Sequence, residues 1–116
     1  MNDSCSDSEI VIGALHMLTD KQFNDSFTAA GGKFIANNFE YVADNQNKPL
    51  SEIVATLFLL GYDSNINGTR TRVSSMFRLF REDQGEAALR KIAASNRIDP
   101  NSVRLAQKIL KERFIH

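Results

Sequence analysis

The side chains of this sequence that are best suited to chemistry are basic, and they lie in its second half. Residues 61–116 hold 11 Lys or Arg and 6 Asp or Glu, a net charge of +5, whereas residues 1–60 hold 3 and 8, a net charge of −5. Eight of the 11 are Arg, whose planar guanidinium matches phosphate and guanine better than the lysine ammonium does. The asymmetry is one hint of a half that binds a polyanion, but basic helices that pack against or face acidic ones within one domain give the same split and are the more common cause.

Residue sets for catalysis or metal binding are weak by comparison. The two histidines, His16 and His116, and the lone Cys5 do not stand at ligand spacing from one another, so we expect no metal site. Gly31-Gly32 lacks the Lys-Ser/Thr that completes a phosphate-binding loop, and the acidic residues of the first half are scattered singly. We therefore expect a protein that is not an enzyme and uses no cofactor.

Length and composition predict one soluble globular domain. The chain has 116 residues, of which 42% are hydrophobic and 24% charged, and these values are ordinary for folded proteins. We expect residues 1–7 to be frayed and residues 8–116 to form a single all-α domain. The sequence shows no signal peptide, and its apolar runs are shorter than the ~18–20 residues that span a bilayer, so a cytoplasmic location without membrane contact is expected.

The elements predicted by apolar periodicity are six or seven helices. Thr19, with Gln22 three residues later, predicts a capping box, and Gly31-Gly32 predicts a helix end. Ser51 is expected to cap residues 52–60, and Asn67-Gly68 leaves open a small hairpin before a helix at 72–81. The remaining helices are expected at residues 8–18, 19–30, 33–44, 85–96 and 100–114. Residues 8–61 would form an acidic support layer and residues 70–116 a basic layer.

The last two of these helices resemble the helix-turn-helix of bacterial repressors over residues 89–110. The resemblance lies in the apolar and small residues that such a motif packs together, namely Leu89, Ile92, Ala93, Ile98, Val103 and Ala106. It implies a three-residue turn at 97–99, after which Asp99 caps a helix that begins at Pro100. Arg97 departs from the pattern, because that position most often holds a glycine in the left-handed conformation.

The resemblance implies a sequence-specific DNA-binding protein, such as a small transcriptional or mobile-element regulator. The helix at 100–113 would then enter the major groove of double-stranded DNA. The residues implied as base-contacting are Asn101, Ser102, Arg104 and Lys108, and those implied as phosphate-contacting are Arg90, Lys91, Arg97, Gln107 and Lys111. Since one such motif makes few base contacts, a homodimer or a partner regulatory subunit is expected.

An ordinary helical hairpin with a capped second helix fits the same residues. In that case the chain is a helical protein–protein interaction module, an adaptor or inhibitor, that does not bind DNA. Its basic half would then dock on an acidic partner surface or on the acidic half of a second copy. Titration with random duplex DNA at two salt concentrations separates the two hypotheses. Arg104, Lys108 and Lys111 pointing into an acidic patch of the same fold would favour the interaction module.

Overall fold

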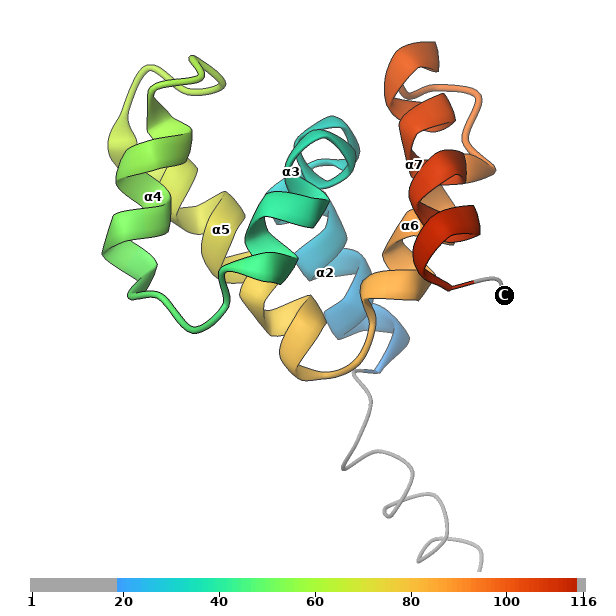
Figure 1. Cartoon of the computed structure of the whole chain (residues 1–116), viewed down its shortest axis with the longest axis horizontal. Helices are drawn as coiled ribbons and strands as arrows, with labels where there is room; N and C mark the ends of the chain where they lie inside the picture. Colours follow the sequence, from blue (N-terminus) through green and yellow to red (C-terminus); the bar gives the residue numbers. More distant parts are fainter. Residues whose placement is uncertain (1–18, 115–116) are drawn as a thin grey trace, which may run out of the picture.

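The computed structural model describes residues 19–114, which contain six α-helices and no β-strand. In chain order they are α2 (Asp20–Ala30), α3 (Gly32–Asp44), α4 (Leu50–Phe58), α5 (Ile66–Arg81), α6 (Gly85–Ala93) and α7 (Pro100–Arg113) (Figure 1). The predicted all-α class is therefore confirmed. The helix expected at 8–18, the frayed residues 1–7, both histidines and Cys5 lie outside the described residues. None of the described helices is long and apolar enough to cross a membrane.

Three helix ends, at Thr19, Gly31 and Asp99, lie where the sequence predicts them. The Thr19 hydroxyl accepts from the Gln22 backbone N–H at 3.1 Å, and the Gln22 side chain accepts from the Thr19 N–H at 3.2 Å, which completes the capping box. Asp99 caps α7 by accepting from the Ser102 N–H, and Pro100 is the first helical residue. Gly31 ends α2 with φ 87°, and α3 begins at the next residue.

Three predicted boundaries are wrong. Ser51 caps nothing, because α4 begins at Leu50, after Pro49. Asn67-Gly68 forms no hairpin: Asn65 accepts from the Asn67 N–H and starts α5 at Ile66, six residues before the expected start. Finally, α6 ends at Ala93 rather than near Asn96, which leaves a six-residue connection at 94–99.

Helices α3, α5 and α7 run in the same direction, so their N-termini lie at one end of the molecule (Figure 1). Toward that end, Arg72 of α5 lies over the Phe34 ring of α3, and Ser102 of α7 contacts Asn37 of α3. Toward the other end, Phe80 packs against Phe39. Arg113 also pairs with Asp44 there, near the C-terminus of α3. Because each helix carries about +0.5 charge at its N-terminus, the three helices add partial positive charge to the shared end.

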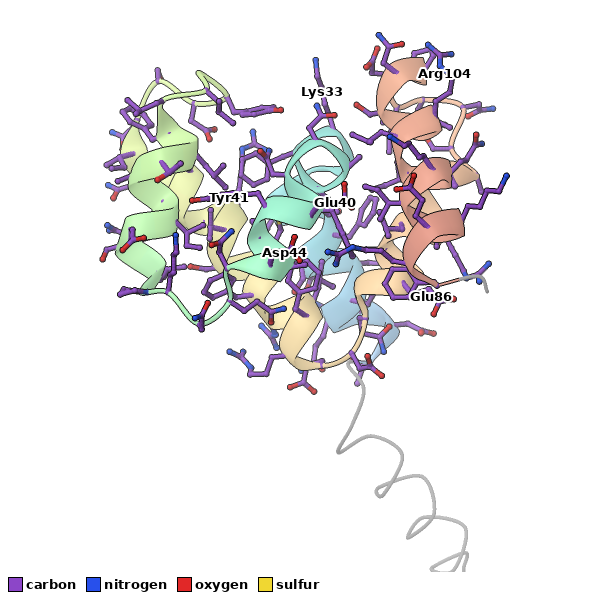
Figure 2. The ribbon with its side chains drawn as sticks, viewed as in Figure 1. Lys33, Glu40, Tyr41, Asp44, Glu86 and Arg104 are labelled. Carbon is purple, nitrogen blue, oxygen red and sulfur yellow. The ribbon has the colours of Figure 1, made fainter. Side chains whose placement is uncertain are left out.

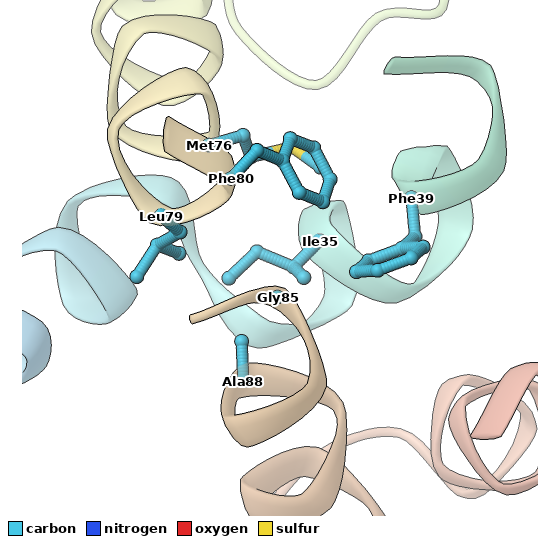
Figure 3. A pocket seen from close by; sticks show the side chains of 7 residues that line it. All are labelled: Ile35, Phe39, Met76, Leu79, Phe80, Gly85 and Ala88. Atoms are coloured by element: carbon cyan, nitrogen blue, oxygen red, sulfur yellow. The ribbon is translucent and has the colours of Figure 1, made fainter. Parts of the chain in front are cut away.

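The hydrophobic core draws on all six helices, so the acidic and basic halves of the chain share it. Its largest fully buried side chains include Phe34 and Phe39 of α3, Met76 of α5 and Leu89 of α6. A gap between α3, α5 and α6 is lined by Ile35, Phe39, Met76, Leu79, Phe80, Gly85 and Ala88 (Figure 3). It has no room for a water molecule, so it is part of the packed interior and not a ligand cavity.

Asp83 is the one non-glycine residue of the described chain with a positive φ, at 59°. It follows the end of α5, where its own N–H donates to the Phe80 carbonyl and the next N–H, of Gln84, donates to the Leu79 carbonyl. This pair of bonds is the Schellman motif, which strongly favours glycine at the position of Asp83.

We expect Asp83→Gly to raise the free energy of unfolding by about 0.5–1 kcal/mol, because it relieves the left-handed strain. Urea denaturation measures this change. Asp83→Ala is the matched control, because it removes the same carboxylate but keeps a Cβ. We expect it not to raise the free energy of unfolding. Equal effects of the two substitutions would attribute the change to charge rather than to backbone strain.

Candidate nucleic-acid interface

The outer face of α7 carries a stripe of exposed polar and basic side chains. Asn101, Arg104, Lys108 and Lys111 follow one another at intervals of three or four residues, so they lie on one side of the helix. The opposite side is buried and consists of Ser102, Ala106, Ile109 and Leu110. We call the four exposed residues the α7 stripe. It spans about 15 Å along the helix axis.

The cations of the α7 stripe are not neutralised by neighbouring carboxylates. None of the ion pairs between residues 19 and 114 includes Arg104, Lys108 or Lys111. Arg104 instead donates a hydrogen bond to the side-chain oxygen of Asn101, within the stripe itself. These side chains therefore do not dock into an acidic patch among residues 19–114, and both a DNA-binding surface and a surface for an acidic partner require such exposure.

Ser102 does not belong to this face, and its assignment as a base-contacting residue is wrong. Its side chain is 1% exposed. Its hydroxyl lies 3.3 Å from a carboxylate oxygen of Asp99 and 3.5 Å from the side-chain oxygen of Asn37 on α3. Ser102 therefore fixes the N-terminus of α7 against α3 and is out of reach of any ligand.

The residues implied as phosphate-contacting divide into two groups. Arg97, in the connection before α7, and Lys111, in the α7 stripe, are exposed and belong to none of the ion pairs between residues 19 and 114. Arg90 and Lys91 lie on α6 and already have partners: Arg90 pairs with Glu86 at 2.7 Å, and the Lys91 ammonium lies 4.8 Å from the centre of the Phe27 ring. Lys91 also donates to Asn24, so it helps to fasten α6 to α2.

Gln107 is likewise engaged within the fold. Its amide donates to the carbonyl of Ala93 at 3.3 Å and so satisfies the exposed C-terminal end of α6. This bond and the packing of Ile98 against Gly32, at the α2–α3 junction, define the connection between α6 and α7. Arg97 is not among the residues with positive φ, so the backbone strain expected there is absent.

The connection between α6 and α7 differs from the motif that the sequence resembles. A helix-turn-helix of the repressor type joins its helices through three or four residues, whereas residues 94–99 form a six-residue connection here. The chain passes through α6, reverses in this connection and returns beside it as α7 (Figure 1). The expected three-residue turn is therefore wrong, while the capped second helix with an exposed basic face is present.

Lys33 is a cation near this face that the sequence did not single out. It is exposed in the first turn of α3, one turn before Asn37, the neighbour of Ser102. Lys33 and Arg104 project from the same end of the molecule, the upper end in Figure 2, while Glu86 lies toward the opposite end. No local pattern marks Lys33, because its place next to α7 depends on the Asn37–Ser102 contact between residues 65 positions apart.

The described residues hold no group of three or more His, Cys, Asp or Glu side chains that could bind a metal ion. In comparisons with known proteins, no family model, no curated protein and no solved structure matches this chain significantly. The function of this chain is therefore inferred from its own residues.

Proposed function

We propose that this protein is a binding protein for double-stranded DNA, with regulation of transcription or of a mobile element as its role, and that the α7 stripe is its contact surface. The observation that carries the proposal is that Arg104, Lys108 and Lys111 are exposed in a row and have no carboxylate partner among residues 19–114. This row of cations is about 10 Å long, so it can face several phosphates of a duplex strand, which carries one charge per ~3.4 Å of helix axis.

The end of the molecule from which the α7 stripe starts supports the same proposal. The N-termini of α3 and α7 lie together there, and backbone N–H groups at helix N-termini favour phosphate. Lys33 and Arg97 add two exposed cations next to these N-termini. In this arrangement Lys33, Arg97 and Lys111 contact phosphate, and Asn101, Arg104 and Lys108 reach base edges. Arg suits guanine, and Asn suits adenine.

The proposal predicts a large and localised effect of charge removal. We expect the triple variant Arg104→Gln, Lys108→Gln and Lys111→Gln to lower affinity for a random-sequence duplex about 10- to 100-fold. On a random sequence all three side chains neutralise phosphate rather than read bases, so we also expect the slope of log K against log salt to flatten by roughly 3, about 0.9 for each cation removed. Fluorescence anisotropy titrations of a labelled duplex at several salt concentrations measure both quantities.

The matched control is a triple variant with the same loss of charge elsewhere. Lys21→Gln, Lys48→Gln and Arg78→Gln change three exposed cations on α2, before α4 and on α5, away from the α7 stripe. We expect this control to lose affinity only a few-fold. Equal losses in the two variants, or no binding of the parent protein at low salt, would contradict a DNA-contacting role for α7. The second result would leave the interaction module as the better explanation of the basic face.

Specific readout has its own test, because phosphate contacts alone do not distinguish sequences. After selection of preferred duplexes from a random pool, we expect Arg104→Ala to lower affinity for the selected duplex by about 1–3 kcal/mol and to relax preference at one base pair. If Arg104→Ala weakens binding to all duplexes equally, Arg104 contacts phosphate and not a base.

A further inference from the structure

Three large apolar side chains are exposed around the connection between α4 and α5. Leu59 is 83% exposed, Leu60 is 59% exposed and Ile66 is 39% exposed. Leu59 and Leu60 follow the end of α4, and Ile66 begins α5, so the three are carried by one tight reversal of the chain. We call them the apolar tip. Two consecutive leucines in water are an unfavourable arrangement that an interaction surface would explain.

A second unexplained feature is a hollow of about 220 Å³ lined by residues of α3, α5, α6 and α7. Phe39, Phe80 and Phe114 form its aromatic part, with the Phe39 ring 4.9 Å from Phe80 and 6.2 Å from Phe114 between centroids. Phe114 is still 36% exposed. Asp83, Glu86 and Arg113 are the charged residues of its rim. We call this hollow the aromatic depression, and it has room for a branched aliphatic side chain.

The apolar tip and the aromatic depression lie at opposite ends of the molecule. Ile66 is the first residue of α5, and Phe80 follows it by 14 positions, a distance of about 21 Å along the helix. Figure 1 shows the α4–α5 connection at one end of the molecule, and the turn from α5 into α6 at the other. The two features therefore cannot cover each other within one chain.

The charges around the two features are complementary. Arg70, one turn after Ile66, and Lys33 are exposed at the end that carries the tip, where α3 and α5 have their N-termini. The aromatic depression lies where α3 and α5 end, and the carboxylates on and near its rim outnumber the guanidinium groups. The carboxylates are those of Glu40, Asp44, Asp83 and Glu86, against Arg90 and Arg113. Helix C-termini add partial negative charge at that end.

We propose that a second copy of this chain occupies the aromatic depression, through its apolar tip, so that copies associate head to tail. A symmetric tip-to-tip dimer is disfavoured, because it would bring two Arg70 side chains together. Contact between unlike surfaces does not close a two-fold dimer and extends into a ring or an open chain. The association needs no DNA.

Two variants of the full chain separate this arrangement from the others. Leu59→Ser with Leu60→Ser removes the tip, and Phe114→Lys places a cation in the depression, where it repels the basic tip end. Ala55→Ser, a change at an exposed position within α4, is the matched control. Circular dichroism melts confirm that each variant folds, which is expected because the changed side chains are exposed.

Sedimentation equilibrium gives the decisive result. We expect the mass of the parent and of Ala55→Ser to rise with concentration in the ~10–500 μM range, as a small interface implies. Each of the two variants alone stays monomeric. Their equimolar mixture forms a dimer and nothing larger, because only one intact tip and one intact depression remain.

Other outcomes overturn the proposal. A parent that stays monomeric over the whole range excludes self-association. If Phe114→Lys associates and the variant without the tip does not, the tip binds the tip of another copy. If the mixture of the two variants stays monomeric, the tip and the depression are not partners.

Discussion

Replacing Arg72 with methionine is expected to lower the free energy of unfolding by about 3 kcal/mol, although Arg72 looks like one more cation of a basic helix in the sequence. In the structure its side chain is 29% exposed and is held by partners within the fold. Its Nε donates to both carboxylate oxygens of Asp63, at 3.0 and 3.1 Å, and its Nη1 donates to the Ala30 carbonyl at 2.7 Å. The guanidinium carbon also lies 5.6 Å from the centre of the Phe34 ring.

These contacts join three parts of the fold. Ala30 is the last residue of α2, Asp63 belongs to the α4–α5 connection, and Arg72 lies on α5. Removal of the guanidinium leaves the Asp63 carboxylate, which is 16% exposed, with only the Thr69 hydroxyl as a donor. A charge left in that state costs several times more than a surface ion pair is worth. It also leaves the terminal carbonyl of α2 unsatisfied.

Urea denaturation of Arg72→Met and of the control Arg70→Met tests this account. Arg70 lies on the same helix but is exposed, so its loss is expected to change stability by less than about 0.5 kcal/mol. Asp63→Asn should cost less in the Arg72→Met background than in the parent, because the two residues form one network. Strict additivity of these substitutions would show that the Arg72–Asp63 pair contributes little.

The sequence could predict features that depend on residues close together in the chain. The contacts of Arg72, which join three separate parts of the fold, are not among them. Capping at Thr19 and Asp99 depends on residues three positions apart, and both caps are confirmed. The start of α5 was missed because Asn67-Gly68 has the composition of a turn, while its helical state depends on the Asn65 cap and on packing of the helix that follows. Ser51 fails as a cap because Pro49 occupies the N-cap position, with φ −58° and ψ 142°, so the helix has already begun at Leu50.

The candidate site shows the same limit. Periodicity could place Arg104, Lys108 and Lys111 on one side of a helix, and the exposed stripe on α7 agrees with that. It could not tell that Ser102 is turned toward Asn37, because that contact joins residues far apart in the chain. The net charge of residues 61–116 likewise includes Arg72, Arg90 and Lys91, although each of these side chains has a partner within the fold. Net charge per half therefore overstated the number of cations available to a ligand.

Gly31→Ala is expected to have the other large effect, a loss of about 3–4 kcal/mol in the free energy of unfolding. Gly31 has φ 87° and ψ 131°, a combination open to glycine but strained for any residue with a Cβ. It joins α2 directly to α3: its N–H donates to Phe27 and its carbonyl accepts from Ile35, at 2.8 and 2.9 Å. The backbone therefore cannot rotate to relieve the strain without breaking both bonds.

The added methyl group would also displace Arg72. A Cβ at Gly31 would lie 2.7 Å from the Nη1 atom of Arg72, the atom that donates to the Ala30 carbonyl. Gly61 provides the matched control, because its φ is 85° and nothing lies within 4 Å of the corresponding Cβ. We expect Gly61→Ala to cost about 1–2 kcal/mol, the strain alone. Thermal and urea denaturation of the two variants measure the difference that the Arg72 contact adds.

A double-mutant comparison then assigns that difference. In an Arg72→Met background there is no guanidinium for the new methyl group to displace, so the cost of Gly31→Ala should fall toward that of Gly61→Ala. An unchanged cost would place the whole effect in the backbone and would leave Arg72 with no part in the requirement for glycine at the α2–α3 junction. A reduced cost would show that Gly31 is required here for two separate reasons, its positive φ and the close approach of the side chain that holds α2, α5 and the α4–α5 connection together.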